Sequence, residues 1–465
     1  MNKYTVLINK QNKIKPSFHK YINLLPVKDY NGEEDYLEEQ TLDSYKKLKL
    51  FLKKKGIEIG LDGGYRSIEY QQELYERFQK KLGQVDVSYR VALPGTSEHH
   101  TGLAFDIAIK INDSYEEDEK DTVKREQLYQ KIHLYLAKFG FILRYPKGKE
   151  EITGYQYEPW HFRYVGKIPA EIIMKNHWTL EEYLTKFGAV LYVNKEAGMT
   201  SFDVVNKISN IFGIKKVGHT GTLDPLAEGV LIVTLGQATK ISELLTAEDK
   251  EYIAGVLLGI ETDTLDITGT VVKNKPIDLS KDLEQVVNSY QKTYQQEVPK
   301  YSAIKVNGKK LYEYARKNQE VELPKKEVTI KKIKLLSSDN DTFMIKALVT
   351  KGCYIRSLIR DIGRSLDTYA TMTTLTRTKQ GKIDIKDTNT LKQIEQGTAK
   401  LHSIDEVLDY PTIIVDEETE RKIKNGRKLP NNYQVSTKVI FKNQKNQILG
   451  IYKVEKDMLK VWKNF

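Results

Sequence analysis

Apolar residues recur along the chain at two different spacings, which alternate from segment to segment. Residues 41–56 (TLDSYKKLKLFLKKKG) carry leucines at helical spacing and end in a glycine, the residue that most often closes a helix. Residues 103–109 (LAFDIAI) and 230–236 (VLIVTLG) are short alternating or apolar runs of the kind found in strands. The pattern therefore predicts an α+β fold.

The length and composition limit the kind of protein that this sequence encodes. A chain of 465 residues exceeds what one hydrophobic core usually organises, so two or three domains are expected. No apolar run approaches the length of a membrane span, and the N-terminal residues lack the pattern of a secretory signal. The single cysteine, Cys353, allows no internal disulfide. We therefore expect a cytoplasmic protein without a membrane segment.

The positive charge is concentrated in the second part of the chain. Residues 1–187 hold 30 basic against 28 acidic side chains, whereas the remainder holds 44 against 35. A basic C-terminal part is typical of proteins that bind a polyanion, most simply nucleic acid. A lysine-rich surface without a ligand has the same composition, so charge alone does not decide between the two.

The stretch GHTGTLDPLAEGVLIVTLG, residues 218–236, holds one carboxylate, Asp224, on a loop with glycines on both sides. Pro225 restricts the residue before it to an extended conformation, and an apolar strand follows. A stiff loop against a rigid strand suits the presentation of a catalytic acid. Asp224 could equally form an Asx-turn with its own backbone. The spacing leaves both interpretations open.

Two short stretches in the first part of the chain contain metal-ligand residue types. His99 and Asp106 lie in SEHHTGLAFD, and Glu158 and His161 lie in EPWHFRY. Two imidazoles and one carboxylate form a three-ligand zinc set that leaves a position for water, and the second carboxylate can act as a base. A lone histidine is more often structural, but the chain has only eight and three lie in these stretches.

The motifs SEHHTGLAFD and EPWHFRYVG, with GYRSIEYQ upstream, resemble the D-alanyl-D-alanine carboxypeptidase family of VanY type, over roughly residues 20–175. The resemblance implies that His99, Asp106 and His161 bind zinc and that Glu158 is the general base. It also implies that Arg66 stabilises the oxyanion and that Gln71 and Ser97 hold the terminal D-Ala of the peptide.

Residues 188–430 contain five motifs in the order found in the TruB family of bacterial tRNA pseudouridine synthases, which this part of the chain resembles. They are KEAGMTSFDVV, GHTGTLDPLAEGVLIV, KEYIAGVLLGIETDTLD, YSAIKVNGKKLYEYAR and KGCYIRSLIRDIG. The resemblance implies that Asp224 is the catalytic aspartate and that Arg356 pairs with it. It further implies that Tyr252 packs on the target base, that His219 fills the gap left by the extruded base, and that Leu375 contacts substrate.

These observations lead to one principal hypothesis and two alternatives. The chain is predicted to be a monomeric α+β protein with a zinc carboxypeptidase domain (1–180), a mixed-sheet synthase domain (188–400) and a small C-terminal module (401–465). The synthase would modify uridine 55 in the TΨC loop of tRNA without a cofactor, and the first domain would act on D-Ala-terminated peptides. Alternatively, the peptidase is the working enzyme and the C-terminal part only binds RNA, or the N-terminal domain is inactive.

Overall fold

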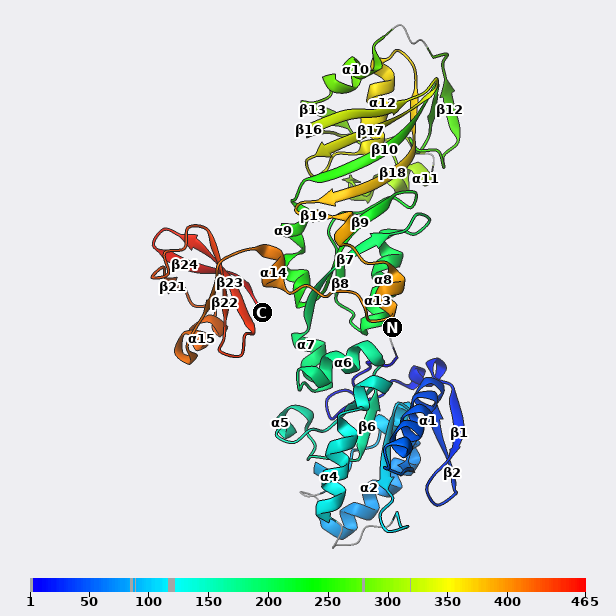
Figure 1. The fold of residues 1–465 in the computed structure, drawn as a ribbon, viewed down its shortest axis with the longest axis vertical. Coiled ribbons are helices and arrows are strands. Elements are labelled where there is room, and N and C mark those ends of the chain that lie inside the picture. The colour runs from blue at the N-terminus through cyan, green and yellow to red at the C-terminus, as the bar shows by residue number, and fades with distance from the viewer. Residues whose placement is uncertain (1–2, 84–86, 88, 116–121, 278–280, 318) are drawn as a thin grey trace. The chain divides into compact units, whose positions relative to one another are not determined.

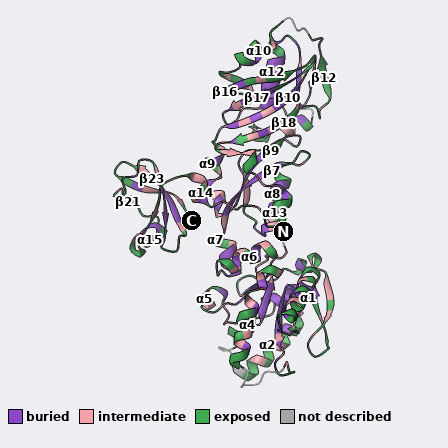
Figure 2. Ribbon diagram, viewed as in Figure 1, coloured by how far each residue is buried: buried purple, intermediate pink, exposed green. Residues whose placement is uncertain are grey.

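The computed structural model describes residues 3–83, 87, 89–115, 122–277, 281–317 and 319–465. Contacts within it divide the chain into two compact units. Unit 1 comprises residues 1–187 and 208–216, and unit 2 comprises residues 188–207 and 217–465. In both units the central strands are mostly buried, whereas the outer faces of the helices are exposed (Figure 2).

Unit 1 is built on a four-stranded antiparallel sheet in the order β3-β4-β6-β5. The strands are β3 (Ile59–Gly63), β4 (Ala104–Ile109), β6 (His161–Tyr164) and β5 (Phe141–Leu143). The main helices are α1 (Glu39–Lys54), α2 (Ile68–Leu82), α4 (Thr122–His133), α6 (Lys167–Lys175) and α7 (Leu180–Lys186). Leucines of α1 and aromatic residues of the strands share one apolar core, which fixes the strand ends where polar residues gather.

The ends of the helices in unit 1 follow from local chemistry. The Glu38 carboxylate accepts hydrogen bonds from the first backbone amides of α1, and Gly56 takes the left-handed conformation just beyond its last turn. At the start of α7, Thr179 and Glu182 form a reciprocal capping box. The helix predicted over residues 41–56 is thus confirmed.

Unit 2 contains a nine-stranded mixed sheet with the central order β13-β16-β17-β10-β18-β9-β7, in which β19 also pairs with β18 and β8 with β9. The strands are β7 (Gly188–Lys195), β8 (Val217–His219), β9 (Glu228–Gly236), β10 (Lys250–Leu258), β13 (Thr293–Glu297), β16 (Lys325–Ser338), β17 (Thr342–Val349), β18 (Ala370–Gln380) and β19 (Ile383–Asp384). Helix α12 (Ile355–Ser365) packs on β18 and β10 (Figure 1).

Strands β18 and β9 run parallel and touch only briefly, at Arg377 opposite Gly229. A side chain at Gly229 would collide with the carbonyl of Arg377, and its φ of +100° also favours glycine. This close approach brings the end of β18 to the loop between β8 and β9, which carries Asp224.

The last part of unit 2 forms a separate five-stranded sheet. Its strands, in spatial order, are β20 (Thr412–Ile414), β22 (Lys438–Lys442), β23 (Ile448–Glu455), β24 (Met458–Asn464) and β21 (Leu429–Pro430). Helix α15 (Glu417–Lys424) packs against β23 and β24 around Ile423. Among the described residues, no helix is long and apolar enough to cross a membrane.

Candidate functional sites

In unit 1 the sheet register places two predicted metal ligands side by side. Asp106 on β4 pairs directly with His161 on β6, and His99 lies in the short 3-10 helix just before β4. That 3-10 helix is followed by Gly102, whose φ of +64° favours glycine and which lies close against the side chain of Leu24. This turn joins the 3-10 helix to β4, so that His99 lies close to Asp106 on that strand.

The three side chains converge at distances that suit one small cation. His99 Nε2 lies 3.4 Å from Asp106 Oδ2, and His161 Nδ1 lies 3.0 Å from Asp106 Oδ1. One ligand atom from each residue can be chosen so that all lie within 4.8 Å of one another. Tetrahedral zinc, with bonds of about 2.0–2.1 Å to nitrogen and oxygen, holds its ligand atoms roughly 3.4 Å apart. The donor set and spacing therefore fit zinc.

All seven residues predicted from the sequence for this site line one cavity of about 330 Å³. They are Arg66, Gln71, Ser97, His99, Asp106, Glu158 and His161. The wall also contains Tyr145, Tyr155 and Trp160, which give it an aromatic side. The cavity therefore brings together a metal-ligand set, a spare carboxylate and a guanidinium.

The cavity residues perturb one another's protonation. Burial raises the pKa of Glu158 to about 7, and burial lowers that of His99 to about 4. Burial would also raise the pKa of Asp106, but the imidazoles of His99 and His161 hold it well below its usual value. Arg66 Nη2 lies 2.7 Å from Asp106 Oδ2. Glu158 Oε2 lies 3.6 Å from His161 Nδ1, so the predicted base is at the edge of the ligand set.

In unit 2 the structure brings Asp224 and Arg356 into direct contact. Arg356, at the start of α12, has its Nε 2.9 Å from Asp224 Oδ2, and its Nη2 donates a hydrogen bond of 3.2 Å to Oδ1. The same guanidinium donates to the carbonyl oxygens of Thr264 and Tyr301 and lies 3.9 Å from Asp266. The arginine is nearly buried and the aspartate one-third exposed, so the carboxylate is held but reachable.

Tyr252 reaches the Asp224 loop through an intermediary. It lies on β10 opposite Arg377 of β18, and the Tyr252 hydroxyl is 3.4 Å from Arg377 Nη1. Arg377 also donates to the carbonyl oxygen of Gly221, in the loop. Leu375 is buried two residues earlier on β18, on the same face as Arg377. His219 ends β8 at the start of the loop, and burial lowers its pKa.

Sequence reasoning missed two buried polar residues that hold the loop. Gln380 Nε2 donates to Thr220 twice, at its carbonyl oxygen (2.8 Å) and its hydroxyl (2.7 Å). Lys195 Nζ donates to the carbonyl oxygen of Pro225 in the loop, at 3.4 Å, and to those of Glu196 and Met199 at the turn after β7. Neither residue belongs to a pattern that predicts burial, because lysine and glutamine are usually exposed.

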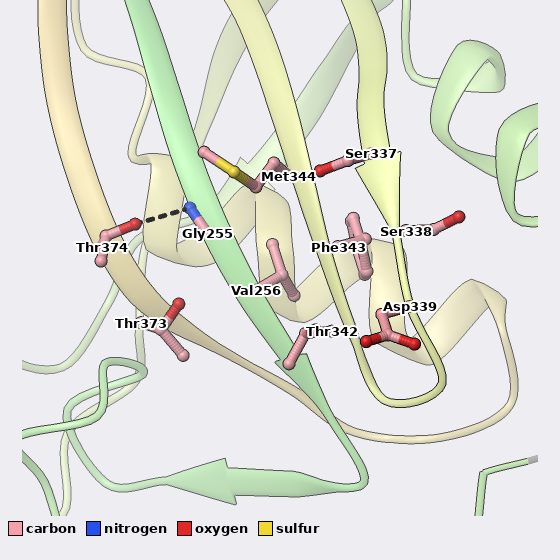
Figure 3. Close-up of a pocket in the computed structure, with 10 residues that line it drawn as sticks. All are labelled: Gly255, Val256, Ser337, Ser338, Asp339, Thr342, Phe343, Met344, Thr373 and Thr374. Carbon is pink, nitrogen blue, oxygen red and sulfur yellow. Dashed lines mark hydrogen bonds between the residues drawn. The ribbon is translucent and has the colours of Figure 1, made fainter.

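A second hollow, of about 290 Å³, lies on the large sheet of unit 2 (Figure 3). Strands β10, β16, β17 and β18 form it, and the backbone amide of Gly255 on β10 donates a hydrogen bond to the hydroxyl oxygen of Thr374 on β18. It contains none of the residues predicted for catalysis. The two predicted clusters, and not this hollow, are therefore the candidate functional sites.

Comparison with known families finds matches in both units of the chain. Residues 34–167 match the D-alanyl-D-alanine carboxypeptidase family. Residues 209–355 match the N-terminal domain of TruB family pseudouridylate synthases, and residues 356–411 match a tRNA pseudouridylate synthase B C-terminal domain.

Individual proteins and solved structures are similar to parts of the chain. The tRNA pseudouridine synthase B of Caldanaerobacter subterraneus subsp. tengcongensis is 43% identical over 254 residues, which are 54% of this chain and 89% of that protein. A mutant of the vancomycin-resistance D,D-pentapeptidase VanY in complex with Zn(II) is 32% identical, covering 39% of this chain and 99% of that one, with a TM-score of 0.34. An H/ACA RNP bound to a substrate RNA is 21% identical, covering 62% and 87%, with a TM-score of 0.45.

The matches define a pseudouridylate synthase preceded by a carboxypeptidase-type domain. Within that class, the chain belongs to the TruB family of tRNA pseudouridine synthases. Both resemblances inferred from the motifs are thus confirmed, as are the predicted α+β class and the two-domain architecture.

Proposed function

We propose that residues 188–400 isomerise uridine 55 to pseudouridine in the TΨC loop of tRNA, with Asp224 as the catalytic carboxylate. The observation that carries the proposal is the contact of Asp224 with Arg356, because a guanidinium that contacts both carboxylate oxygens fixes the orientation of the carboxylate. The target base has to leave the stacked RNA before its glycosidic bond is accessible. Tyr252 then packs on that base, His219 fills the gap, and Leu375 lies against the substrate.

The chemistry uses only groups of this chain and the RNA. The bond between uracil N1 and the ribose breaks, the base rotates, and a bond from C5 to the same ribose carbon forms; C5 loses its proton and N1 takes one up. A single ionised carboxylate can serve as nucleophile or as base on the ribose. No cofactor is needed for this isomerisation.

The test compares Asp224→Asn with Asp249→Asn, whose carboxylate pairs with Lys331 at the surface. Both variants are incubated with a tRNA T-arm labelled at C5, and proton release and RNA binding are measured. We expect Asp224→Asn to bind RNA but release no label, and Asp249→Asn to behave as the unaltered protein. Label release at the normal rate by Asp224→Asn would refute the assignment.

We propose, second, that residues 1–180 are a zinc-dependent carboxypeptidase for D-Ala-terminated peptides. The convergence of His99, Asp106 and His161 in one cavity with Glu158 supports this. Zinc bound there would supply Lewis-acid activation of water and of the scissile carbonyl. Glu158 would take up and return the proton of the reaction.

Three residues of the cavity wall would bind the peptide in this proposal. Arg66 would face the developing oxyanion, and Gln71 and Ser97 would hold the terminal D-Ala. Gln71 Nε2 is already bonded to the carbonyl oxygen of Ala92, which leaves its buried Oε1 for a ligand, since no partner for it exists among the described residues.

Zinc content and D-Ala release from a synthetic peptide test this proposal. We expect His99→Ala to lose stoichiometric zinc, and Glu158→Gln to keep zinc while losing D-Ala release. An unaltered chain that contains no zinc, or zinc retained fully by His99→Ala, would contradict it.

The alternative, a peptidase with a non-catalytic RNA-binding part, predicts that the unaltered chain releases no label from RNA. The same assays therefore separate the two. We further propose that residues 401–465 are a small TruB-associated module. We also propose that the protein is a monomer and that it works in the cytoplasm, where tRNA is available. Sedimentation of the purified protein tests the monomer.

A further inference from the structure

A group of buried charges lies behind the metal-ligand set of unit 1. The side chains of Glu98, Arg144 and Arg163 are fully buried. Glu98 Oε1 accepts hydrogen bonds from Arg144 Nε at 2.8 Å and from Arg163 Nη1 at 2.6 Å. Buried ion pairs of this kind add little stability compared with apolar packing of the same volume. Their presence next to a candidate active site therefore suggests a role besides stability.

The other oxygen of Glu98 faces a metal ligand. Glu98 Oε2 lies 4.0 Å from His161 Nε2, and both atoms are buried with no hydrogen-bond partner among the described residues. His161 Nδ1 points to Asp106 on the opposite side of the ring. Its Nε2 is consequently free to donate toward Glu98.

His99 provides an internal comparison. It presents Nε2 to Asp106, and its Nδ1 lies 2.6 Å from the carbonyl oxygen of Gly64. Histidines that bind metals nearly always donate their second ring N–H to a carboxylate or carbonyl, which fixes the tautomer and the ring orientation. His99 has such a partner, and Glu98 is placed to be the partner of His161.

We propose that Glu98 is a positioning residue for the metal site: its Oε2 accepts the Nε2 proton of His161, so that Nδ1 presents its lone pair to the metal. This inference rests on the proposed zinc peptidase function.

The positioning residue is in turn connected to helix α7. Arg144 spans the two, because its Nη1 and Nη2 donate to both carboxylate oxygens of Glu181 on α7, at 3.0 and 2.7 Å. Asn9 donates to the same carboxylate. Loss of Glu181 would release one end of Arg144 and loosen Glu98. The chain of contacts His161–Glu98–Arg144–Glu181 thus connects one carboxylate of α7 to the metal-ligand set.

The test measures zinc affinity of the full chain by competition with a chelator. Removing an outer partner of a metal ligand typically costs 10–100-fold in affinity, which we expect for Glu98→Gln. A smaller loss, of several-fold, is expected for Glu181→Gln. Glu182→Gln is the matched control, because Glu182 lies on the same helix but bonds Lys149 and Lys186 instead of Arg144. It should bind zinc as the unaltered chain does.

A second measurement keeps the inference testable if Glu98→Gln does not fold. Nitrogen and proton chemical shifts of His161 in the zinc-loaded protein report whether its Nε2 proton is hydrogen-bonded, a property that a merely structural role of Glu98 would not set. We expect a downfield-shifted, slowly exchanging Nε2 proton in the unaltered protein and a weaker hydrogen bond in Glu181→Gln.

The outcomes separate this inference from the function beneath it. Zinc affinity of a folded Glu98→Gln within twofold of the unaltered chain, or an Nε2 proton of zinc-loaded His161 that is not hydrogen-bonded, would overturn the positioning role. An unaltered chain that binds no zinc would contradict the peptidase proposal itself.

Discussion

Replacement of Arg356 by lysine tests how much the guanidinium contributes beyond its charge. The arginine contacts both oxygens of Asp224 and donates to two backbone carbonyls, whereas a lysine ammonium is a single point donor and loses this planar fork. One charge-assisted hydrogen bond is worth about 1.5–3 kcal/mol. Lost entirely from the transition state, it would slow the reaction roughly 10- to 150-fold.

Exposure decides where in that range the effect should lie. Because Asp224 is one-third exposed, water can replace part of the lost contact, and we expect the lower part of the range, roughly 10–50-fold. Single-turnover label release from a saturating T-arm RNA measures the step directly. Arg364→Lys, on the same helix but half-exposed beside Glu261, should retain the normal rate. A rate of Arg356→Lys within threefold of normal would refute the orienting role.

Three further predictions concern stability and reactivity. Gly229→Ala should destabilise unit 2 in thermal melts by about 1–2 kcal/mol because of its positive φ, and by a further ~1–3 kcal/mol because the new side chain collides with Arg377. Gly198→Ala is the control: it has a positive φ but open space around it, so only the first loss is expected. Equal losses in the two variants would contradict this. Burial raises the pKa of Cys353 to about 12, so iodoacetamide at pH 8.5 should modify the native thiol roughly a thousandfold more slowly than the unfolded one; similar rates would contradict this. Burial would raise the pKa of Glu182, but hydrogen bonds from two lysines lower it to about 2. The ionised Glu182 therefore stabilises the fold fully above the unfolded-state pKa, and this contribution is lost as the pH falls from about 4.5 to 2. The difference in stability between the unaltered chain and Glu182→Gln should shrink over that interval, and a constant difference would count against it.

Local features of the fold followed from the sequence because their causes are local. Helix α1, predicted over residues 41–56, ends where Gly56 takes the left-handed conformation. The metal-ligand types were equally visible, since His99 and Asp106 flank a single turn into a strand.

Long-range partners were not visible in the same way. Arg356 and Asp224 are 132 residues apart, and without a resemblance to a known family no local pattern would pair them. Glu98 was passed over although it precedes His99 directly, because its partners Arg144 and Arg163 come from distant parts of unit 1. Gln380 contacts the Asp224 loop only because β18 and β9 approach closely at Gly229. Such contacts depend on the sheet order, which periodicity does not specify.

The most direct test of the central claim is pseudouridine mapping of tRNA from a host strain that lacks this gene. The account predicts uridine at position 55 in that strain, restored to pseudouridine by the unaltered gene and by Glu158→Gln, and not by Asp224→Asn. Pseudouridine at position 55 restored by Asp224→Asn, or present in the strain without the gene, would contradict it.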